Sequence, residues 1–405
     1  RRKNLKKTLL TICAAVALLA FVPFLAFETA AAKPAVINVY NWGQYISDGS
    51  DGLLDVNAAF TEATGIEVNY STYESNESLY TKLKTGGSSY DVIIPSDYMI
   101  ARLISEGMLQ KLNYDNIPNY ASIGESFKNT LYDPNNEYSV PYFWGTVGII
   151  YNTRYVDTVT SWDALWDERY SGKILMFDNP RDAFAAAELA LGIDVNTEDE
   201  SDLRAAAELL AAQKPLVQSY VMDQVFDQME RAEAWIAPYY AGDFITMHRE
   251  NPDLAFCFPE EGFNLYIDAM CIPTSSTNKE AAEAYINFMC SFEAAAANAA
   301  YTGYGSPVNG VAESLELTEY ERGIAYPSDE ILSKGVAYLT LSKEATQIMD
   351  SLWLDVRTDA STTSWVTYAV ATAAVVIIAA VYLAYRSNKK RKRAAKRRAD
   401  ADGAR

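Results

Sequence analysis

The sequence predicts an α/β protein with a membrane-spanning helix near its C-terminus. From residue 36 onward, short apolar runs typical of strands alternate with stretches in which apolar residues recur at helical spacing. Residues 90–95, YDVIIP, are almost continuously apolar, as expected for a strand buried on both faces of a parallel sheet. Residues 365–385 contain no charged side chain and would span about 31 Å as a helix, close to the thickness of a bilayer core.

Three predicted strand–helix pairs fill the first part of the chain. Leu53, Val56, Phe60 and Ala63 have helical spacing, and Gly65 is a typical residue to end that helix. Ligands of open α/β sheets bind at the carboxyl ends of the strands, so we expect a site there. The predicted strands cover residues 36–41, 66–72 and 90–95, the helices residues 53–63, 75–85 and 97–106, and the strand ends residues 41–45, 72–74 and 96–98.

A second alternating set follows a section rich in Pro, Asn and Asp. Residues 139–152, SVPYFWGTVGIIYN, predict one long strand or a pair of strands, and residues 313–356 predict further helices. The other predicted strands cover residues 173–177, 234–237 and 265–273, and the other predicted helices cover residues 183–191, 200–212 and 279–290.

One carboxylate interrupts the strand predicted at residues 265–273, LYIDAMCIP. Asp268 stands among apolar residues, and Tyr266, two positions earlier, faces the same side of a strand. A carboxylate inside such a run is costly unless a cation meets it. We therefore expect Asp268 to bind a cationic ligand.

The charge is distributed unevenly along the chain. The net charge is −19, yet residues 1–7 hold 5 of the 34 basic residues and residues 386–405 hold 10. The body between residues 33 and 385 is left with 19 basic and 50 acidic residues. This balance disfavours nucleic acid as a partner and suits a cationic ligand, although an acidic surface that only maintains solubility explains it equally well.

Several classes of site are not supported. The chain has one histidine, no CxxC pair, and no P-loop, GxGxxG or GxSxG motif, so we expect no enzyme activity, no metal and no cofactor. Of the four cysteines, Cys257 and Cys271 would form a disulfide only if they lay on adjacent strands.

Two segments suit a membrane. Residues 1–32 have the basic, apolar and small-residue regions of a signal peptide, and an uncleaved anchor or the last helix of a fused membrane domain are alternatives. Residues 358–364 form a polar linker to the helix at 365–385, and the basic tail at 386–405 is expected in the cytoplasm. The body would then be a tethered extracytoplasmic domain, in the periplasm or on the outer surface of the cell membrane.

Five stretches resemble one known family. They are NWGQYI, the block from IEVNYSTYESNE to EGMLQKL, SVPYFWGTVGIIYN, SWDALWDERYSGKILMFD and LYIDAMCIP. Together they are similar to the spermidine/putrescine-binding proteins of ABC-type polyamine importers, in order, from about residue 36 to about residue 335. The YSTYESNE…YTKLK…YD…PS block is the most specific part of this resemblance.

The resemblance implies a two-lobed periplasmic-binding-protein fold of type II. Lobe one would comprise residues 35–142 and 271–312, and lobe two residues 143–270 and 313–357. A polyamine would bind in the cleft between them, the lobes would close by a hinge motion, and the closed form would dock on the permease subunits.

The resemblance also implies a set of ligand-binding residues. Aromatic walls would contact the methylenes and carboxylates would pair with the ammonium groups. Asn179 stands where the family has an acid, Tyr240 and Tyr266 where it has tryptophan, and Gly43 where it has threonine. The implied ligand-binding residues are Trp42, Tyr45, Ser96, Tyr98, Asn179, Asp182, Tyr240, Tyr266, Asp268, Tyr304 and Tyr338.

Alternatives stay open at this point. Asp182 could instead be a helix N-cap, and Asp97 could either substitute for the acid lost at Asn179 or be a helix N-cap. The adjacent tyrosines Tyr239 and Tyr240 would also suit a ferric-ion-binding protein of the same fold, and the C-terminal tether would suit a polyamine sensor that feeds no permease.

Overall fold

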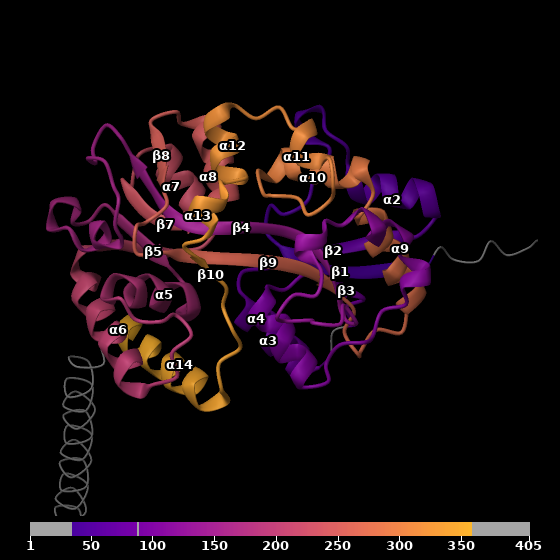
Figure 1. The fold of residues 1–405 in the computed structure, drawn as a ribbon, viewed down its shortest axis with the longest axis horizontal. Coiled ribbons are helices and arrows are strands. Elements are labelled where there is room, and N and C mark those ends of the chain that lie inside the picture. Colours follow the sequence, from indigo (N-terminus) through magenta and orange to yellow (C-terminus); the bar gives the residue numbers. More distant parts are fainter. Residues whose placement is uncertain (1–34, 87–88, 359–405) are drawn as a thin grey trace, which may run out of the picture.

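The computed structural model describes residues 35–86 and 89–358 and shows two α/β lobes joined by long strands (Figure 1). Its strands are β1 (Val36–Trp42), β2 (Glu67–Tyr73), β3 (Val92–Ile93), β4 (Ser139–Asn152), β5 (Ile174–Phe177), β6 (Val217–Val221), β7 (Ile236–Tyr240), β8 (Leu254–Cys257), β9 (Phe263–Cys271) and β10 (Gly335–Val336). Its α-helices are α2 (Val56–Thr64), α3 (Asn76–Thr85), α4 (Asp97–Ser105), α5 (Pro180–Leu191), α6 (Glu200–Gln213), α7 (Val225–Glu230), α8 (Ala241–Glu250), α9 (Lys279–Met289), α10 (Phe292–Thr302), α11 (Val311–Ser314), α12 (Glu319–Ala325), α13 (Asp329–Leu332) and α14 (Lys343–Thr358).

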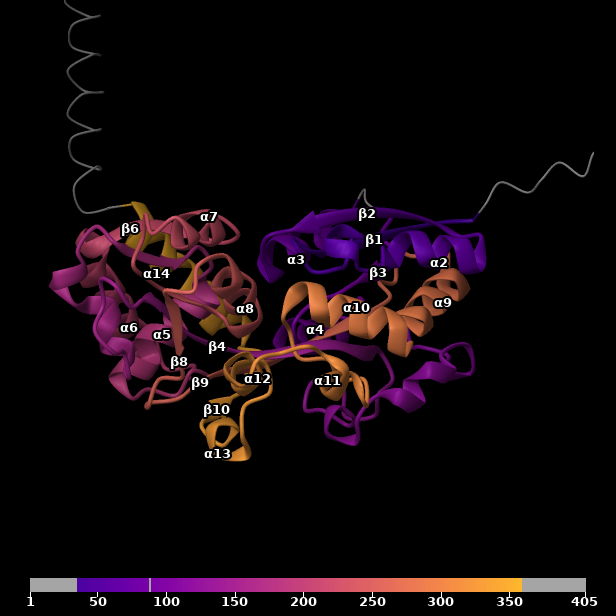
Figure 2. The same cartoon turned by 90° about the horizontal axis from the view of Figure 1, so that it is seen from above.

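Lobe one is built on the parallel strands β2, β1 and β3. Asp55 caps α2 through the N–H of Ala58, and Ser75 forms a capping box at the start of α3. Helix α9 comes from the far end of the sequence and packs beside α2, with the rings of Phe60 and Tyr285 5.1 Å apart (Figure 2). The six predicted elements of this region are present, with β3 shorter than the predicted strand.

Strands β4 and β9 connect the lobes and lie antiparallel. The first half of β4 pairs with β9, and its second half pairs with β7 and β8. Residues 139–152 form one continuous strand rather than a pair, and all fourteen of its residues are buried. The whole sheet has the order β2-β1-β3-β9-β4-β7-β5-β6 and therefore runs through both lobes.

Lobe two is built on β7, β5 and β6, with α5, α6 and α14 packed together below the sheet in Figure 1. The predicted strands and helices at residues 173–177, 183–191 and 200–212 are present as β5, α5 and α6. The strand expected at residues 234–237 begins later and continues to Tyr240. Strands β6, β8 and β10 and helices α7, α8 and α10 were not predicted.

The three described cysteines are free and buried. Cys257 is paired with Ile149 of β4 in the sheet register, whereas Cys271 is paired with Ser139 of the same strand. Ten residues of extended chain separate those two positions, about 33 Å. A disulfide needs Cα atoms within about 7 Å, so Cys257 and Cys271 cannot pair.

Both predicted membrane segments fall outside residues 35–86 and 89–358. Within those ranges no helix is long and apolar enough to cross a membrane. The predicted signal segment at residues 1–32, the linker from residue 359 and the helix at 365–385 lie outside the described residues, as does the basic tail.

Candidate ligand-binding cleft

One cavity lies between the lobes, where the carboxyl ends of strands from both of them meet. Lobe one lines it with the segments that follow β1 and β2 and with the start of α4. These segments include the strand ends at which the sequence predicted a site. Lobe two lines it with the starts of α5 and α8 and the loop between β6 and α7. All eleven residues that the resemblance implied line this cavity: Trp42, Tyr45, Ser96, Tyr98, Asn179, Asp182, Tyr240, Tyr266, Asp268, Tyr304 and Tyr338.

The cavity is lined by many acidic and aromatic side chains. Its acidic residues are Glu74, Glu77, Asp97, Asp182, Asp223, Asp243 and Asp268. Its aromatic residues are Trp42, Tyr45, Tyr98, Phe226, Tyr239, Tyr240, Tyr266, Tyr304 and Tyr338. No lysine, arginine or histidine lines the cavity in the described part of the chain. Seven acidic side chains among nine aromatic rings form an acidic, partly apolar site.

Asp268 lies on β9 with 4% of its surface exposed. Its Oδ2 accepts a hydrogen bond of 2.6 Å from the Tyr45 hydroxyl, while its buried Oδ1 has no partner among the described residues. Burial raises the pKa of Asp268 to about 6, and the polar side chains of Ser96 and Tyr45 oppose that rise. The Tyr266 hydroxyl is also buried without a partner. A cation in the cavity would satisfy the free carboxylate oxygen.

Asp182 lies in the first turn of α5 but does not cap this helix. The N-cap is Asn179, whose Oδ1 accepts from the Asp182 N–H at 2.8 Å, so the N-cap reading of Asp182 is wrong. The Asp182 carboxylate accepts three hydrogen bonds, from Asn179 Nδ2 at 2.9 Å, the Tyr240 hydroxyl at 2.6 Å and the Tyr338 hydroxyl at 3.1 Å. Protein groups therefore hold this acid in place before any ligand arrives.

The aromatic side chains form a connected wall. Tyr45 and Tyr304 meet edge to face at 4.8 Å, and Tyr240 and Tyr266 at 5.7 Å. Gly242 makes room for the Tyr304 ring, since a Cβ at this position would overlap it. Burial raises the pKa of each of these four tyrosines well above its usual value, so their hydroxyls stay neutral.

Trp42 and Tyr98 are positioned from lobe one. The Trp42 indole N–H donates to the Ile94 carbonyl at 2.8 Å, which fixes the ring at the end of β1. The Tyr98 hydroxyl donates to Glu77 Oε1 at 2.9 Å. Ser96 is held by Asn76, whose Nδ2 donates to the Ser96 hydroxyl at 3.1 Å.

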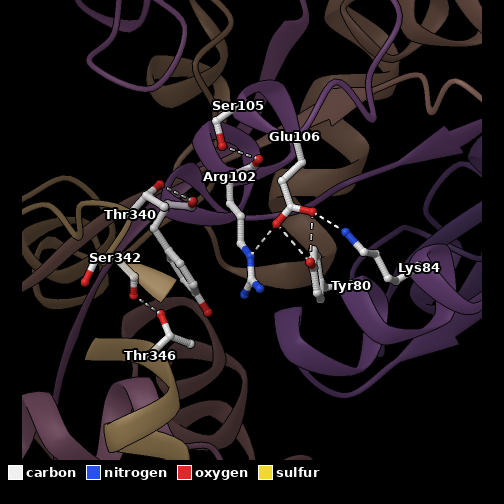
Figure 3. A network of polar contacts seen from close by, with 9 residues as sticks. Tyr80, Lys84, Arg102, Ser105, Glu106, Thr340, Ser342 and Thr346 are labelled. Carbon is white, nitrogen blue, oxygen red and sulfur yellow. Dashed lines mark hydrogen bonds and ion pairs between the residues drawn. The ribbon is translucent and has the colours of Figure 1, made fainter. Parts of the chain in front are cut away.

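One edge of the cleft is bridged by the segment that leads into α14. The Thr340 hydroxyl donates to the Tyr98 carbonyl at 2.7 Å. Figure 3 shows this edge, with Thr340, Ser342 and Thr346 opposite a network around Glu106. Glu106 accepts from the Tyr80 hydroxyl at 2.8 Å and from Arg102 Nε at 3.2 Å. These contacts bring α3, α4 and the approach to α14 together beside Tyr98.

Sequence reasoning missed part of the acidic lining. Asp97 follows the N-cap Ser96 and is not itself the cap; burial raises its pKa to about 8. Asp243 accepts from the Tyr304 hydroxyl at 2.9 Å, and burial raises its pKa to about 8 as well. The sequence signal for Asp243 was its place three residues after Tyr240, at a helix start. Glu74 falls at the strand end predicted at residues 72–74, whereas Glu77 and Asp223 carried no comparable signal.

Comparisons with known proteins agree with this geometry. Residues 88–334 match the family of bacterial extracellular solute-binding proteins. The spermidine/putrescine-binding periplasmic protein of Salmonella typhimurium is 34% identical over 299 residues, which cover 73% of this chain and 84% of the relative. These relatives are substrate-binding transport proteins rather than enzymes.

Solved structures show the same two-lobed fold. The spermidine/putrescine ABC transporter substrate-binding protein PotD of Streptococcus pneumoniae has a TM-score of 0.66 and 35% identity, covering 80% of this chain and 98% of that one. The TpPotD lipoprotein of Treponema pallidum has a TM-score of 0.71 and 28% identity, with 80% and 99% covered. The chain therefore belongs to the family of bacterial extracellular solute-binding proteins, beside the spermidine/putrescine-binding periplasmic proteins.

Proposed function

We propose that this chain is the substrate-binding component of an ABC importer and captures a polyamine in the cleft between its lobes. The observation that carries the proposal is the lining of the cavity: seven carboxylates, nine aromatic rings and no basic side chain. The names of the relatives, which bind spermidine and putrescine, support the same ligand class.

A polyamine matches this lining chemically. It is a methylene chain with ammonium groups at fixed spacing, so aromatic walls can cover the methylenes and contribute about 0.5–2 kcal/mol per cation–π contact. Carboxylates pair with the ammonium groups through charge-assisted hydrogen bonds. Asp268, on the crossing strand β9, supplies a buried oxygen that no described residue satisfies, and Asp182 supplies a second acid in the first turn of α5.

We assign the eleven implied residues to three roles. Asp268 and Asp182 anchor ammonium groups, while Ser96 and Asn179 hold polar positions at the helix starts. The aromatic walls are Trp42, Tyr45, Tyr98, Tyr240, Tyr266, Tyr304 and Tyr338.

Calorimetric titration tests the proposed function directly. The purified protein is titrated in turn with putrescine, spermidine and spermine at neutral pH, and we expect a heat of binding with at least one of them. Melting temperature measured with and without the same ligand gives a second readout, since a ligand that binds only the folded state stabilises it. Absence of both signals with all three polyamines would refute the proposal.

Closure of the lobes and delivery to a permease complete the proposed role. We place lobe one at residues 35–142 and 271–312, and lobe two at residues 143–270 and 313–357. The two crossing strands, β4 and β9, would then carry the hinge. Small-angle scattering with and without ligand tests closure, which should reduce the radius of gyration.

We further propose that the helix predicted at residues 365–385 anchors the protein to the cell membrane, with the binding lobes extracytoplasmic. Its support is the uncharged sequence followed by a basic tail. Expression of the full chain and of a chain that stops at residue 364 tests this: only the full chain should resist extraction from membranes by alkaline carbonate.

The ferric-ion alternative is not favoured by the tyrosine pair that suggested it. A ferric site would use phenolate oxygens, but burial raises the pKa of Tyr239 and Tyr240 well above the usual value. The Tyr240 hydroxyl also donates to Asp182. A visible charge-transfer band on addition of ferric ion would restore this alternative, and genes for a permease and an ATPase beside this one would exclude the sensor role.

A further inference from the structure

Asp223 reaches the cavity from the loop between β6 and α7 and lies against the opposite lobe. Its carboxylate occupies the space beside Gly43, which follows β1, and a Cβ at Gly43 would overlap Asp223 Oδ2. The backbone of Gly43 does not have a positive φ, so a side chain at this position would displace the Asp223 carboxylate rather than strain the backbone. The Asp223 carboxylate of lobe two thus lies against the backbone of Gly43 in lobe one.

The Asp223 carboxylate has no hydrogen bond and no ion pair with any described residue. The next acid along, Asp227, is instead paired with Arg231 at 2.8 Å, one helical turn away. Asp223 lines the cavity together with Phe226 and is exposed to solvent, so it lies at the rim. Burial, and then the nearby Glu74 carboxylate, raise its pKa. This rim position carries negative charge with no cation to balance it.

The neighbouring Asn179 does not provide that charge. Asn179 is neutral, and its amide is used by Asp182 and by the start of α5. Asn179 Nδ2 also lies 3.7 Å from the sulfur of Met222, the residue directly before Asp223. At this end of the cavity, therefore, Asp223 and the nearby Glu74 are the acids without a partner among the described residues, and Asp223 is the one that lies against Gly43 of the opposite lobe. At the inner wall the unpartnered groups are the buried Asp268 Oδ1 and the Tyr266 hydroxyl.

We propose that Asp223 is a specificity-determining residue that pairs with a terminal ammonium group of a triamine or tetraamine at the rim of the cleft. Gly43, which has no side chain, leaves the space that the Asp223 carboxylate occupies. This inference rests on the proposed polyamine function. A ligand anchored at Asp268 on the inner wall contacts Asp223 only if its chain extends to the rim. A short diamine held inside would leave Asp223 in water and gain nothing from it.

The test compares ligands of different length on matched variants. Asp223→Asn should weaken spermine and spermidine binding by about tenfold, the loss of one charge-assisted pair, and change putrescine affinity by less than twofold. Gly43→Ala should weaken the same two ligands, because its methyl group displaces the carboxylate. Combining the two changes should cost little more than either alone. The control Asp227→Asn, on the same segment but paired outside the cavity, should change nothing.

Two results would overturn the inference. Unchanged affinities for all three polyamines in Asp223→Asn would show that this acid does not contact the ligand. Equal losses for putrescine and spermine would show a general effect on charge or closure. In both cases wild-type binding would stand and the proposed function with it. If the wild-type protein binds no polyamine, the proposed function fails first.

Discussion

Asp268 and Asp182 belong to the same cavity but are held in opposite ways. Asp182 accepts three hydrogen bonds from Asn179, Tyr240 and Tyr338. Asp268 accepts one from Tyr45 and buries its other oxygen without a partner. Lobe two thus presents an acid whose geometry is fixed beforehand, whereas the strand between the lobes presents an acid that is satisfied only by a ligand. The same residue type can therefore serve as a structural anchor or as an unfilled acceptor.

The largest expected effect comes from Asp268→Asn. This change should lower polyamine affinity by about 100-fold or more, because it removes the partner of a desolvated ammonium group. It should leave the free protein as stable as the wild type or more stable, since no buried charge remains. Calorimetric titration and melting curves without ligand measure the two effects. Retained affinity would show that the cation binds elsewhere.

Asp182→Asn should have a smaller effect on binding and the opposite effect on the free protein. Three donors point at this carboxylate, and an amide group would turn its own N–H groups toward some of them. We expect the free energy of unfolding to fall by about 1–3 kcal/mol and the affinity to fall by about tenfold. Urea denaturation without ligand measures the first, with Asp227→Asn as the control. Unchanged stability would contradict the comparison.

The pH dependence should give the smallest but most diagnostic effect. The pKa values of Asp268, at about 6, and of Asp97 and Asp243, at about 8, lie above the usual 3.8. Between about pH 4 and pH 8 the folded state without ligand therefore binds protons that the unfolded state has released, and its stability falls as the pH rises. A bound polyamine favours the charged carboxylates, so affinity should rise with pH over the same range.

Melting curves from about pH 5 to pH 8, with and without spermidine, test that sign. The stabilisation by spermidine should grow with pH, and titrations in two buffers of different ionisation enthalpy should show proton release on binding. Asp268→Asn should lose the part of the stability change near pH 6. Stabilisation that is constant over this range would mean that these acids are already charged before the ligand binds.

Local sequence signals carried much of the fold and of the site. The helix end at Gly65 and the helix predicted at residues 75–85 are read from neighbouring residues, and the structure has both. The buried carboxylate at Asp268 was visible as a charge in an apolar strand, with Tyr266 two positions away, and both line the cavity. The other implied residues needed the family resemblance, because a tyrosine in a strand usually packs in a core. Their binding roles stay predictions.

Residue order along the chain determined the alternating elements, the buried strand with Asp268 and the surplus of acid over base, because each depends on neighbours within a few positions. Folding determined how distant groups meet. Asn179 caps α5 and binds the N–H of Asp182. The Tyr45 hydroxyl donates to Asp268, 223 positions away in the sequence, and Asp223 lies against Gly43. Periodicity records which face of an element is buried, but not which partner covers it. That choice followed from β4 and β9, which cross between the lobes and bring both sets of strand ends to one cavity.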